Sequence, residues 1–357
     1  MRIAVVLGGG GLKGFAHLGV VRALRERGIT PTVFAGTSIG SLVAAAVTTG
    51  TSVERLEHSA RELKRAQLFQ LNRMKIVIDR MRAPSVYAGE PLRALINDLV
   101  HERTFAQLVS PLFVNTVDAE TGFQQVWGMP GLQEVSVRDA VYASCALPGA
   151  FPPGLVGGRT CMDGGAVDNL PVNVAAQDMD AVIAVDVGSS DMTRAEGIAG
   201  KGFFDISMRA AQITTAALQR AQLDKWTKPP MLLIRPRVNH IDWFAFGHAA
   251  FLIDEGYRAA VEALEHFETM MTAGAGIYPR RVMEVEVSRE LCVGCRLCTV
   301  LAPGLFAMDA EGKAYARERI LHWSPADGAF VRQCPTSAIT ARRLERRTPP
   351  SVTSFRD

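Results

Sequence analysis

Short apolar runs alternate with helical patterns along the first part of the chain. Strand-like and helical patterns follow one another at residues 3–7, 14–27, 32–35 and 39–48. Strands that alternate with helices are typical of a largely parallel sheet covered by helices. We therefore predict an α/β fold in which a largely parallel sheet is sandwiched by helices. Further strands are predicted at 112–117, 123–127, 181–187 and 231–234, and further helices at 203–223 and 249–271.

The hydrophobic pattern changes after residue 272, and this change predicts a second domain. A loop-like segment at 272–279 separates the last long helical pattern from a stretch of different character. That stretch has strand-like runs at 282–287 and 338–341, with a cysteine-rich loop between them. The segment from Thr348 onward is expected to be a disordered tail. The predicted parts are a first domain at 1–272, a small α+β domain at 282–342 and a tail at 343–357.

Composition and charge narrow the class of protein. Hydrophobic residues make up 48% of the chain and charged residues 21%, as in ordinary globular proteins. The formal net charge of +3 is too small to favour nucleic-acid binding. No run approaches the roughly 18 apolar residues of a membrane span, and the first residues lack the layout of a signal peptide. We expect a cytoplasmic protein, with peripheral contact to the inner face of the membrane left open.

Residues 36–40 read Gly-Thr-Ser-Ile-Gly and match GxSxG, the pattern of a nucleophile elbow. They lie where a predicted strand ends and a predicted helix begins, which is the context that the elbow requires. A sharp turn there exposes Ser38 on strained backbone, and the flanking glycines let strand and helix approach closely. The positive end of the helix favours negative charge at the same place. Ser38 is therefore a candidate nucleophile, although GxSxG also arises by chance.

A second glycine-rich loop, at 8–14, follows the first predicted strand and opens a helix. Successive backbone N–H groups that no side chain obstructs can converge on one anion. In acyl transfer that anion is the tetrahedral oxyanion, and losing one donor costs about 2.7–4 kcal/mol of barrier. The loop also satisfies the dinucleotide pattern GxGxxG, which expects a carboxylate at the end of the next strand. This chain has Gly36-Thr37-Ser38 there, so the nucleotide interpretation is the weaker one.

A serine hydroxyl needs a base within hydrogen-bond reach. Of the seven histidines only His17 lies near a motif, and such a histidine is more often structural. Asp163 is the better candidate, because the glycine turn Asp163-Gly164-Gly165 presents it after a strand-like run at 155–161. Asp–Gly turns are common in all proteins. The weight of Asp163 therefore depends on the other motifs around it.

Four sequence blocks in this order resemble the patatin-like phospholipases. They are the glycine loop at 9–14, the elbow at 36–40, the block Ala-Ser-Cys-Ala-Leu-Pro-Gly-Ala-Phe at 143–151, and Asp163-Gly164-Gly165. Asn169 with Pro171, and residues 252–257, also look like this family, so the resemblance covers about residues 1–270. It implies a patatin-like α/β hydrolase fold and a Ser–Asp dyad that works without histidine.

The resemblance implies a role for each matching residue. Ser38 attacks the ester carbonyl and Asp163 takes its proton, after which water hydrolyses the acyl-enzyme. Because the ordinary pKa of aspartate is about 3.9, Asp163 can serve as a base only where it is partly desolvated. A lipid or another acyl ester is the implied substrate. The implied oxyanion donors are the amides of Gly9, Gly10 and Gly11, and the residues that we interpret as positioning and packing groups are Ser144, Cys145 and Pro148.

The segment 53–82 is basic and partly amphipathic, with eight basic residues against four acidic ones. Such a segment can lie on an anionic bilayer and admit an acyl chain. The alternative is a cap helix with a solvated basic face, which we favour slightly.

Four of the six cysteines gather near the C-terminus. Cys292, Cys295 and Cys298 give two consecutive CxxC spacings, and Cys334 precedes a proline farther on. In a reducing cytosol this pattern indicates metal ligands rather than disulfides. Three close thiolates hold one side of a cubane iron–sulfur cluster, and a remote one completes it. Zinc is the weaker alternative, because the spacing is not the paired CxxC of a zinc ribbon.

Residues 282–342 resemble bacterial ferredoxins on this spacing. In two-cluster ferredoxins a further cysteine follows the third one after three residues and precedes proline, whereas this chain has Ala302-Pro303 there. The resemblance therefore implies one 4Fe-4S cluster. Its role stays open, since the cluster could be structural, sense oxidation or deliver electrons to a redox partner. We predict a serine-dependent lipid acyl hydrolase with a fused domain for redox sensing or electron transfer. Two alternatives stay open: a redox protein whose hydrolase fold is a binding module, and an acyltransferase with the same dyad.

Overall fold

The computed structural model describes residues 1–71, 85–188 and 195–344. The chain divides into two compact units, Met1–Tyr278 and the part from Pro279 onward. The first unit thus reaches beyond residue 272, where the sequence placed the end of the first domain. The predicted disordered tail from Thr348 onward lies outside the described residues.

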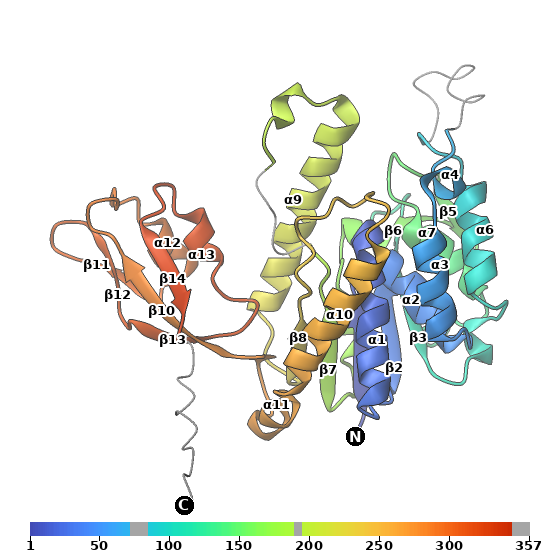
Figure 1. Cartoon of the computed structure of the whole chain (residues 1–357), viewed down its shortest axis with the longest axis horizontal. Coiled ribbons are helices and arrows are strands. Elements are labelled where there is room, and N and C mark those ends of the chain that lie inside the picture. The colour runs from blue at the N-terminus through green and yellow to red at the C-terminus, as the bar shows by residue number, and fades with distance from the viewer. Residues whose placement is uncertain (72–84, 189–194, 345–357) are drawn as a thin grey trace, which may run out of the picture. The chain divides into compact units, whose positions relative to one another are not determined.

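A mixed, mostly parallel sheet forms the centre of the first unit (Figure 1). Its strands are β1 Ile3–Leu7, β2 Val33–Thr37, β3 Leu112–Asp118, β4 Gln124–Trp127, β5 Gly154–Val156, β6 Arg159–Asp163, β7 Ala181–Val185, β8 Met231–Ile234 and β9 Ile277–Tyr278. They lie in the order β5-β6-β3-β2-β1-β7-β8-β9, and β4 also pairs with β3. The pairings from β3 through β2, β1, β7 and β8 to β9 are parallel, whereas β4, β5 and β6 pair antiparallel.

The three central strands β1, β2 and β7 are buried at all five of their positions. Side chains of a strand point alternately to the two faces of the sheet. Burial of every position therefore means that both faces are covered, which explains the continuous apolar runs in the sequence. The prediction of a largely parallel sheet sandwiched by helices is confirmed.

Helices cover this sheet, and α1 and α10 pack side by side along it (Figure 1). Gly256 permits their close approach, because a Cβ atom there would lie 1.9 Å from the Ala16 carbonyl oxygen. None of the described helices is both long enough and apolar enough to cross a bilayer. The helices are η1 Gly11–Phe15, α1 Ala16–Glu26, α2 Ile39–Thr48, α3 Val53–Glu62, α4 Arg65–Leu68, α6 Glu90–Leu99, η3 Phe105–Gln107, α7 Val137–Cys145, η4 Gly164–Ala166, α8 Val172–Ala175, η5 Ile198–Gly200, α9 Phe203–Asp224, α10 Ala249–Leu264 and α11 Phe267–Ala273.

Three local predictions for the first unit were wrong. The strand predicted at 155–161 is the hairpin of β5 and β6, which turns at Gly157 and Gly158 with positive φ angles. The helix predicted at 249–271 is two helices, because α10 ends at Leu264 and α11 begins at Phe267. The loop predicted at 272–279 contains β9, which extends the sheet beyond β8.

The second unit is a small antiparallel arrangement. Strand β10 (Arg281–Val287) pairs with β13 (Ile320–Trp323) on one side and with β14 (Ile339–Arg343) on the other. A separate pair is made by β11 (Phe306–Met308) and β12 (Ala314–Ala316). Two short helices, α12 (Leu297–Leu301) and α13 (Ala329–Gln333), complete the unit. The predicted small α+β domain is therefore present.

Candidate active site and cluster site

Ser38 occupies a strained turn between β2 and α2. Its backbone has φ 54° and ψ −128°, in a region that residues other than glycine seldom adopt. Such conformations cost about 1–3 kcal/mol and persist where the surrounding structure imposes them. Here a Cβ atom at position 40 would lie 2.0 Å from the Leu7 carbonyl oxygen. Gly40 therefore lets α2 start directly beside β1, and the tight turn presents Ser38 as the motif predicts.

Ser144, at the end of α7, holds the elbow in place. The Ser38 N–H donates to Ser144 Oγ at 2.9 Å, and the Ser144 hydroxyl donates to the Asn115 carbonyl oxygen at 2.7 Å. Ser144 is fully buried. Because its one proton is committed to Asn115, its oxygen is oriented to accept from the elbow. Through these two hydrogen bonds Ser144 can position the elbow, the role that we interpreted for it from the sequence.

The structure brings Asp163 to Ser38. Both residues line the same pocket, and the Ser38 side chain lowers the pKa of the Asp163 carboxyl. Asp163 is the last residue of β6, is 4% exposed, and accepts the Gly165 N–H at 2.8 Å. Burial raises the pKa of Asp163 to about 6, while the hydrogen bond from Gly165 and the Ser38 side chain hold it lower than burial alone would. A carboxyl group with this pKa is a better base near neutral pH than an ordinary aspartate.

His17 does not take part in this arrangement. Its side chain is fully buried, and Nε2 hydrogen bonds to the Gly8 carbonyl oxygen at 2.8 Å. Burial lowers the pKa of His17 to about 4, so the ring is neutral at physiological pH. It therefore ties α1 to the glycine loop, as expected for a structural histidine.

The glycine loop offers two free N–H donors. The Gly9 N–H already donates to the Asn169 carbonyl oxygen at 3.2 Å, and Asn169 Nδ2 donates back to the Gly9 carbonyl oxygen at 3.1 Å. Within the described ranges the N–H groups of Gly10 and Gly11 have no acceptor. Of the three amides implied as oxyanion donors, the structure thus leaves Gly10 and Gly11 free and engages Gly9.

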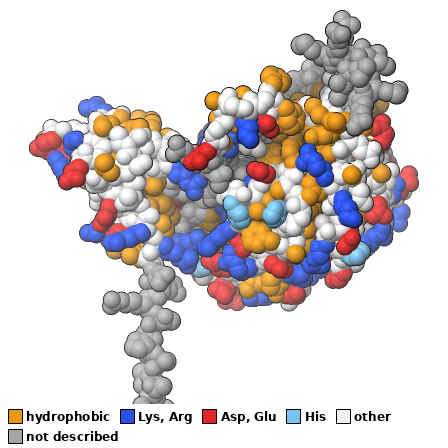
Figure 2. Space-filling model, turned by 45° about the horizontal axis from the view of Figure 1, so that its top comes forward, with side chains coloured by type: hydrophobic (Ala, Val, Ile, Leu, Met, Phe, Trp, Pro, Cys, Tyr) orange, Lys and Arg blue, Asp and Glu red, His pale blue; other side chains and the backbone are white. Residues whose placement is uncertain are grey.

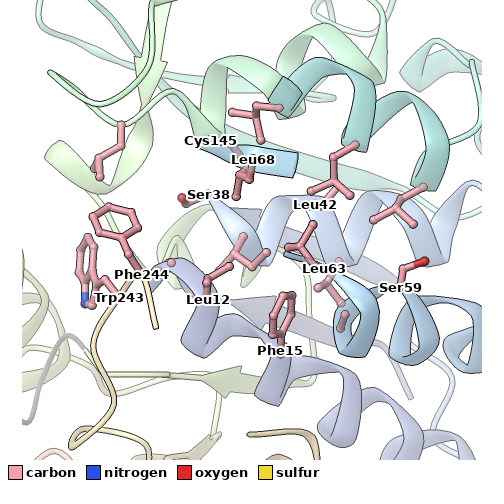
Figure 3. A pocket seen from close by; sticks show the side chains of 18 of the residues that line it. Leu12, Phe15, Ser38, Leu42, Ser59, Leu63, Leu68, Cys145, Trp243 and Phe244 are labelled. Atoms are coloured by element: carbon pink, nitrogen blue, oxygen red, sulfur yellow. The ribbon is translucent and has the colours of Figure 1, made fainter. Parts of the chain in front are cut away.

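Ser38 and Asp163 open into an apolar pocket with a cavity volume of about 110 Å³. Figure 3 shows Trp243 and Phe244 at one end of it, with Leu42 and Leu63 beyond Ser38 and Ser59 at the other end. An apolar pocket with a few convergent polar groups is a typical small-molecule site. The remaining wall residues are mostly aliphatic or aromatic: Leu12, Phe15, Leu18, Ile39, Val43, Leu56, Ala60, Leu68, Phe69, Leu92, Leu95, Leu99, Cys145, Leu147 and Phe151.

Part of the basic segment 53–82 contributes to this pocket. Leu56, Leu63 and Leu68 line its wall, whereas residues 72–82 lie outside the described residues. The apolar residues of α3 are buried, and its exposed residues are largely charged. The exposed charges of α3 are of both signs, so the solvated basic face that the sequence slightly favoured for segment 53–82 stays a prediction.

Cys145 lines the pocket but lacks the character of a nucleophile. Burial, followed by the charge of Asp163, raises the pKa of its thiol. The nucleophilic form of cysteine is the thiolate, so this thiol is unreactive at neutral pH.

Phe69 forms the centre of a group of aromatic rings at the pocket. Its ring contacts those of Tyr87, Phe151, Phe244 and Phe246, with centroids 4.8 to 5.8 Å apart. Aromatic pairs at these distances stabilise each other beyond the burial of their area. The group joins segments that are distant in the sequence, and the sequence alone gave no signal for it.

The four predicted cluster ligands line one pocket of the second unit. Cys292 Sγ accepts the Ala314 N–H at 3.4 Å, and Cys334 Sγ accepts the Ala338 N–H at 3.3 Å. The pKa of Cys298 is raised by burial and by the charges of Cys292 and Cys295. Four thiols in one pocket, two of them accepting an amide N–H at sulfur, match the kind of donor set that an iron–sulfur cluster uses. In the described parts no three His, Cys, Asp or Glu side chains are grouped as ligands of a metal ion, so the case for a cluster rests on the cysteine spacing and on the pocket that the four cysteines share.

Comparison with known proteins identifies both units. Residues 5–176 match the family model of patatin-like phospholipases, and residues 285–341 match the 4Fe-4S single cluster domain. The chain contains a patatin-like phospholipase domain. It is followed by a 4Fe-4S single cluster domain, so both resemblances seen in the sequence are confirmed. The lipid hydrolase class that the sequence indicated is the class of this family.

Similar proteins include much longer chains. Lysophospholipase NTE1 of Mycosarcoma maydis is 31% identical over 301 residues, which are 75% of this chain and 15% of that protein. Human patatin-like phospholipase domain-containing protein 6 is 34% identical over 195 residues, 54% of this chain and 14% of that protein. This chain therefore spans about one seventh of the length of these two relatives. The crystal structure of VipD from Legionella pneumophila aligns with 77% of this chain and 67% of its own at 16% identity and TM-score 0.45.

The patatin-like domain also holds polar residues that the sequence did not single out. Asn115 Nδ2 donates to Thr37 Oγ1 at 3.1 Å and to the Asp168 carbonyl oxygen at 2.6 Å. Gln124 Nε2 donates to Asn115 Oδ1 at 2.9 Å. These bonds link β2, β3 and β4 to the turn that follows Asp163. In the sequence Asn115 is only a polar interruption of an apolar strand, so its spacing carried no signal.

Proposed function

We propose that this chain is a serine-dependent lipid acyl hydrolase of the phospholipase or lysophospholipase kind. The observation that carries the proposal is that Ser38, on a strained turn, and the buried Asp163 meet in the wall of one apolar pocket. Neither residue is in its ordinary state, because Ser38 has strained backbone and Asp163 a raised pKa. Perturbed groups of this kind cluster at functional sites.

The proposed reaction begins with attack of Ser38 Oγ on the ester carbonyl carbon, while the hydroxyl proton passes to Asp163. The N–H groups of Gly10 and Gly11 bind the resulting oxyanion, helped by the positive end of α2. The alcohol leaves with the proton from Asp163, and the acyl group stays on Ser38. Water then gives a proton to Asp163 as it attacks the acyl-enzyme, and the fatty acid departs as Ser38 regains its proton.

Two effects account for most of the rate acceleration in this scheme. General base catalysis by a positioned carboxylate is worth about 10²–10⁴-fold. Each oxyanion donor contributes about 10²–10³-fold. Both require groups that are fixed before the substrate arrives, and the bonds of Ser144 and Asn169 provide that fixation.

An acyl chain is the ligand that the pocket fits. Its walls are aliphatic and aromatic, and its polar residues include the catalytic pair. Burial of a methylene group stabilises a complex by about 0.8 kcal/mol, so a chain of several methylenes gains its affinity from such walls. The name of the fungal relative, a lysophospholipase, agrees with a substrate that carries an acyl chain.

For the second unit we propose that Cys292, Cys295, Cys298 and Cys334 hold one 4Fe-4S cluster. Such a cluster supplies one-electron redox chemistry. The common pocket of the four thiols supports this ligand set. The proposed role is redox sensing or electron transfer to a redox partner. We further propose that the protein acts in the cytoplasm and takes its substrate at a membrane surface.

Turnover measurements test the hydrolase proposal. Anaerobically purified parent, Ser38→Ala and Asp163→Asn are compared on a soluble medium-chain ester and on lysophosphatidylcholine. We expect both variants to lose at least about 10³-fold in kcat, because members of a catalytic unit fail together. Turnover that survives in Ser38→Ala would reject the proposal. Added alcohols then separate hydrolysis from acyl transfer, since a transferase yields a new ester in place of fatty acid.

A further inference from the structure

Helix α9 presents two faces of unexpected character. Its C-terminal half packs on the segment that follows Asp163, whereas its N-terminal half projects from the sheet (Figure 1). Surface helices usually bury an apolar face and expose a polar one. Helix α9 departs from this rule, because its buried residues are Thr215, Ala216, Gln219 and Leu223, two polar and two apolar, while large apolar side chains lie exposed on its outer side.

The buried face of α9 carries polar side chains that bond to the surroundings of the candidate active site. Thr215 Oγ1 donates to the Gly165 carbonyl oxygen at 3.1 Å. Gln219 Oε1 accepts from Asn169 Nδ2 at 3.4 Å, and the Gln222 side chain lowers the pKa of the Asp168 carboxyl. The three side chains are spaced i, i+4 and i+7, so they share one face of the helix. That face therefore holds the turn that follows Asp163, the candidate base. Through Asn169 it also contacts the glycine loop.

The opposite face of α9 is an apolar stripe, formed by Phe203, Ile206, Ala210, Ile213 and Ala217. All five residues are exposed, and the three large side chains are 88%, 45% and 51% exposed. Their spacing of three and four residues keeps them on one line along the helix. Figure 2 shows hydrophobic side chains at several places on this face of the molecule, interspersed with charged ones. An ordered row of exposed apolar side chains marks an interaction surface.

We propose that this apolar stripe docks the chain on a lipid surface, an inference that rests on the proposed lipid hydrolase function. Stable protein interfaces use about 20–30 residues on each side, whereas the stripe is one side chain wide. A narrow apolar face is sufficient for a helix that lies in the interfacial region of a bilayer. The other face of the same helix contacts the segment that follows Asp163, the candidate base. Docking through the stripe would therefore hold the candidate active site near the lipid surface that carries the substrate.

Vesicle binding tests the proposal. Ser38→Ala chains, which leave the lipid intact, are mixed with phosphatidylcholine vesicles and sedimented at low and high salt. We expect salt-insensitive binding, because apolar contacts are not screened. Replacing Phe203, Ile206 and Ile213 together by serine is expected to weaken binding at least about tenfold. The control is Val109→Ser, an apolar residue more exposed (99%) than the three large side chains of the stripe, which lies just before β3 at the opposite sheet edge from Ser38. It is expected to bind like the parent.

A second arm uses chains that retain Ser38 and measures their turnover of a soluble short-chain ester. The triple variant should keep its turnover within about twofold, which shows that its fold and site are intact. If the parent lacks this turnover, the hydrolase proposal fails while the vesicle result still stands. Parent-like vesicle binding by the triple variant would overturn the stripe, and salt-sensitive binding would point to the basic segment 53–82. A dimer that the triple substitution dissociates, without change in vesicle binding, would also overturn it.

Discussion

The two units fix their candidate sites by different means. In the first unit, a large core of sheet and helices surrounds Ser38 and Asp163, and the catalytic geometry is set by backbone turns and buried hydrogen bonds. In the second unit the core found in the described residues has nine buried members, and two of them are the candidate ligands Cys292 and Cys298. The candidate cluster site is therefore part of the core that stabilises the fold of the second unit.

This difference has a physical cause in size. A short unit buries little apolar area, and small domains commonly depend on metals or disulfides for stability. Metal ligands that sit in the core couple metal binding to folding. The patatin-like domain has a large core of ordinary side chains, and its candidate active groups need no metal to be held in place. We therefore expect its folding not to depend on the cluster. The comparison thus predicts that the two units respond independently to loss of the cluster.

The largest expected effect follows from removing the cluster. Cys292→Ser should abolish iron binding and cooperative folding of the second unit, while the first unit keeps its melting temperature and ester turnover within about twofold. Hydrogen exchange resolved by mass spectrometry reads the two units separately. Val300→Ser, at an exposed position beside the ligands, is the control and should keep the cluster. A parallel collapse of the first unit would break the comparison.

A smaller effect is expected for the stability of Asp163→Asn. The folded-state pKa of Asp163 is raised from 3.8 to about 6, so the folded protein holds this proton more tightly than the unfolded chain. Below pH 3.8 both states are protonated and no charge is buried, whereas above pH 6 the folded state carries the buried charge. Asparagine should therefore raise the free energy of unfolding by about 3 kcal/mol at pH 8 and by almost nothing near pH 4.

Denaturant unfolding at the two pH values measures this difference. Asp254→Asn is the control, because its side chain is 75% exposed and should give no pH-dependent gain. An Asp163→Asn gain of equal size at both pH values would show that the charge of Asp163 is not the source of the cost.

A further effect is expected for Ser144→Ala, which removes the acceptor of the Ser38 N–H. Leaving a buried group unpaired costs about 1–3 kcal/mol, so kcat should fall about 10- to 100-fold with KM nearly unchanged. Ser52→Ala is a matched control, since this hydroxyl also accepts a backbone N–H but does so at the start of α3. A fall in turnover of similar size in both variants would mean that Ser144 acts on stability alone.

The smallest effect is a pH limb. Because Asp163 must be ionised to accept a proton, kcat/KM for a soluble ester should be halved near pH 6 and fall tenfold for each further unit of acidification. It should be level above pH 7. A fall in kcat/KM that begins only near pH 4 would show that the Asp163 carboxyl is not desolvated. The claim that the core of the first unit sets the properties of its active groups would then fail.

The parts of this molecule that the sequence predicts are those whose determinants are contiguous. Strands β1 and β8 and helix α2 have the predicted bounds, because their apolar runs end at turn residues. The elbow at Ser38 is likewise encoded within five residues. The cysteine spacing around Cys292 identifies its domain for the same reason.

The parts that the sequence missed depend on contacts between distant segments. Asn169 clamps Gly9 only because β1 and the turn after Asp163 meet in space, so the engagement of the Gly9 amide was not predictable. A helical period predicts α9 but cannot say which face lies inward. Thr215 and Gln219 are buried on the inward face because their partners, Gly165 and Asn169, lie in the segment that follows Asp163.

Covalent labelling of Ser38 tests the central claim most directly. Parent and Asp163→Asn chains are treated anaerobically with a fluorophosphonate carrying an alkyl chain, and the adduct is mapped by mass spectrometry. The account predicts one adduct on Ser38 in the parent, slowed at least about 10²-fold in the variant and slowed by a competing lysophospholipid. A folded parent that gains no adduct on Ser38 would contradict it.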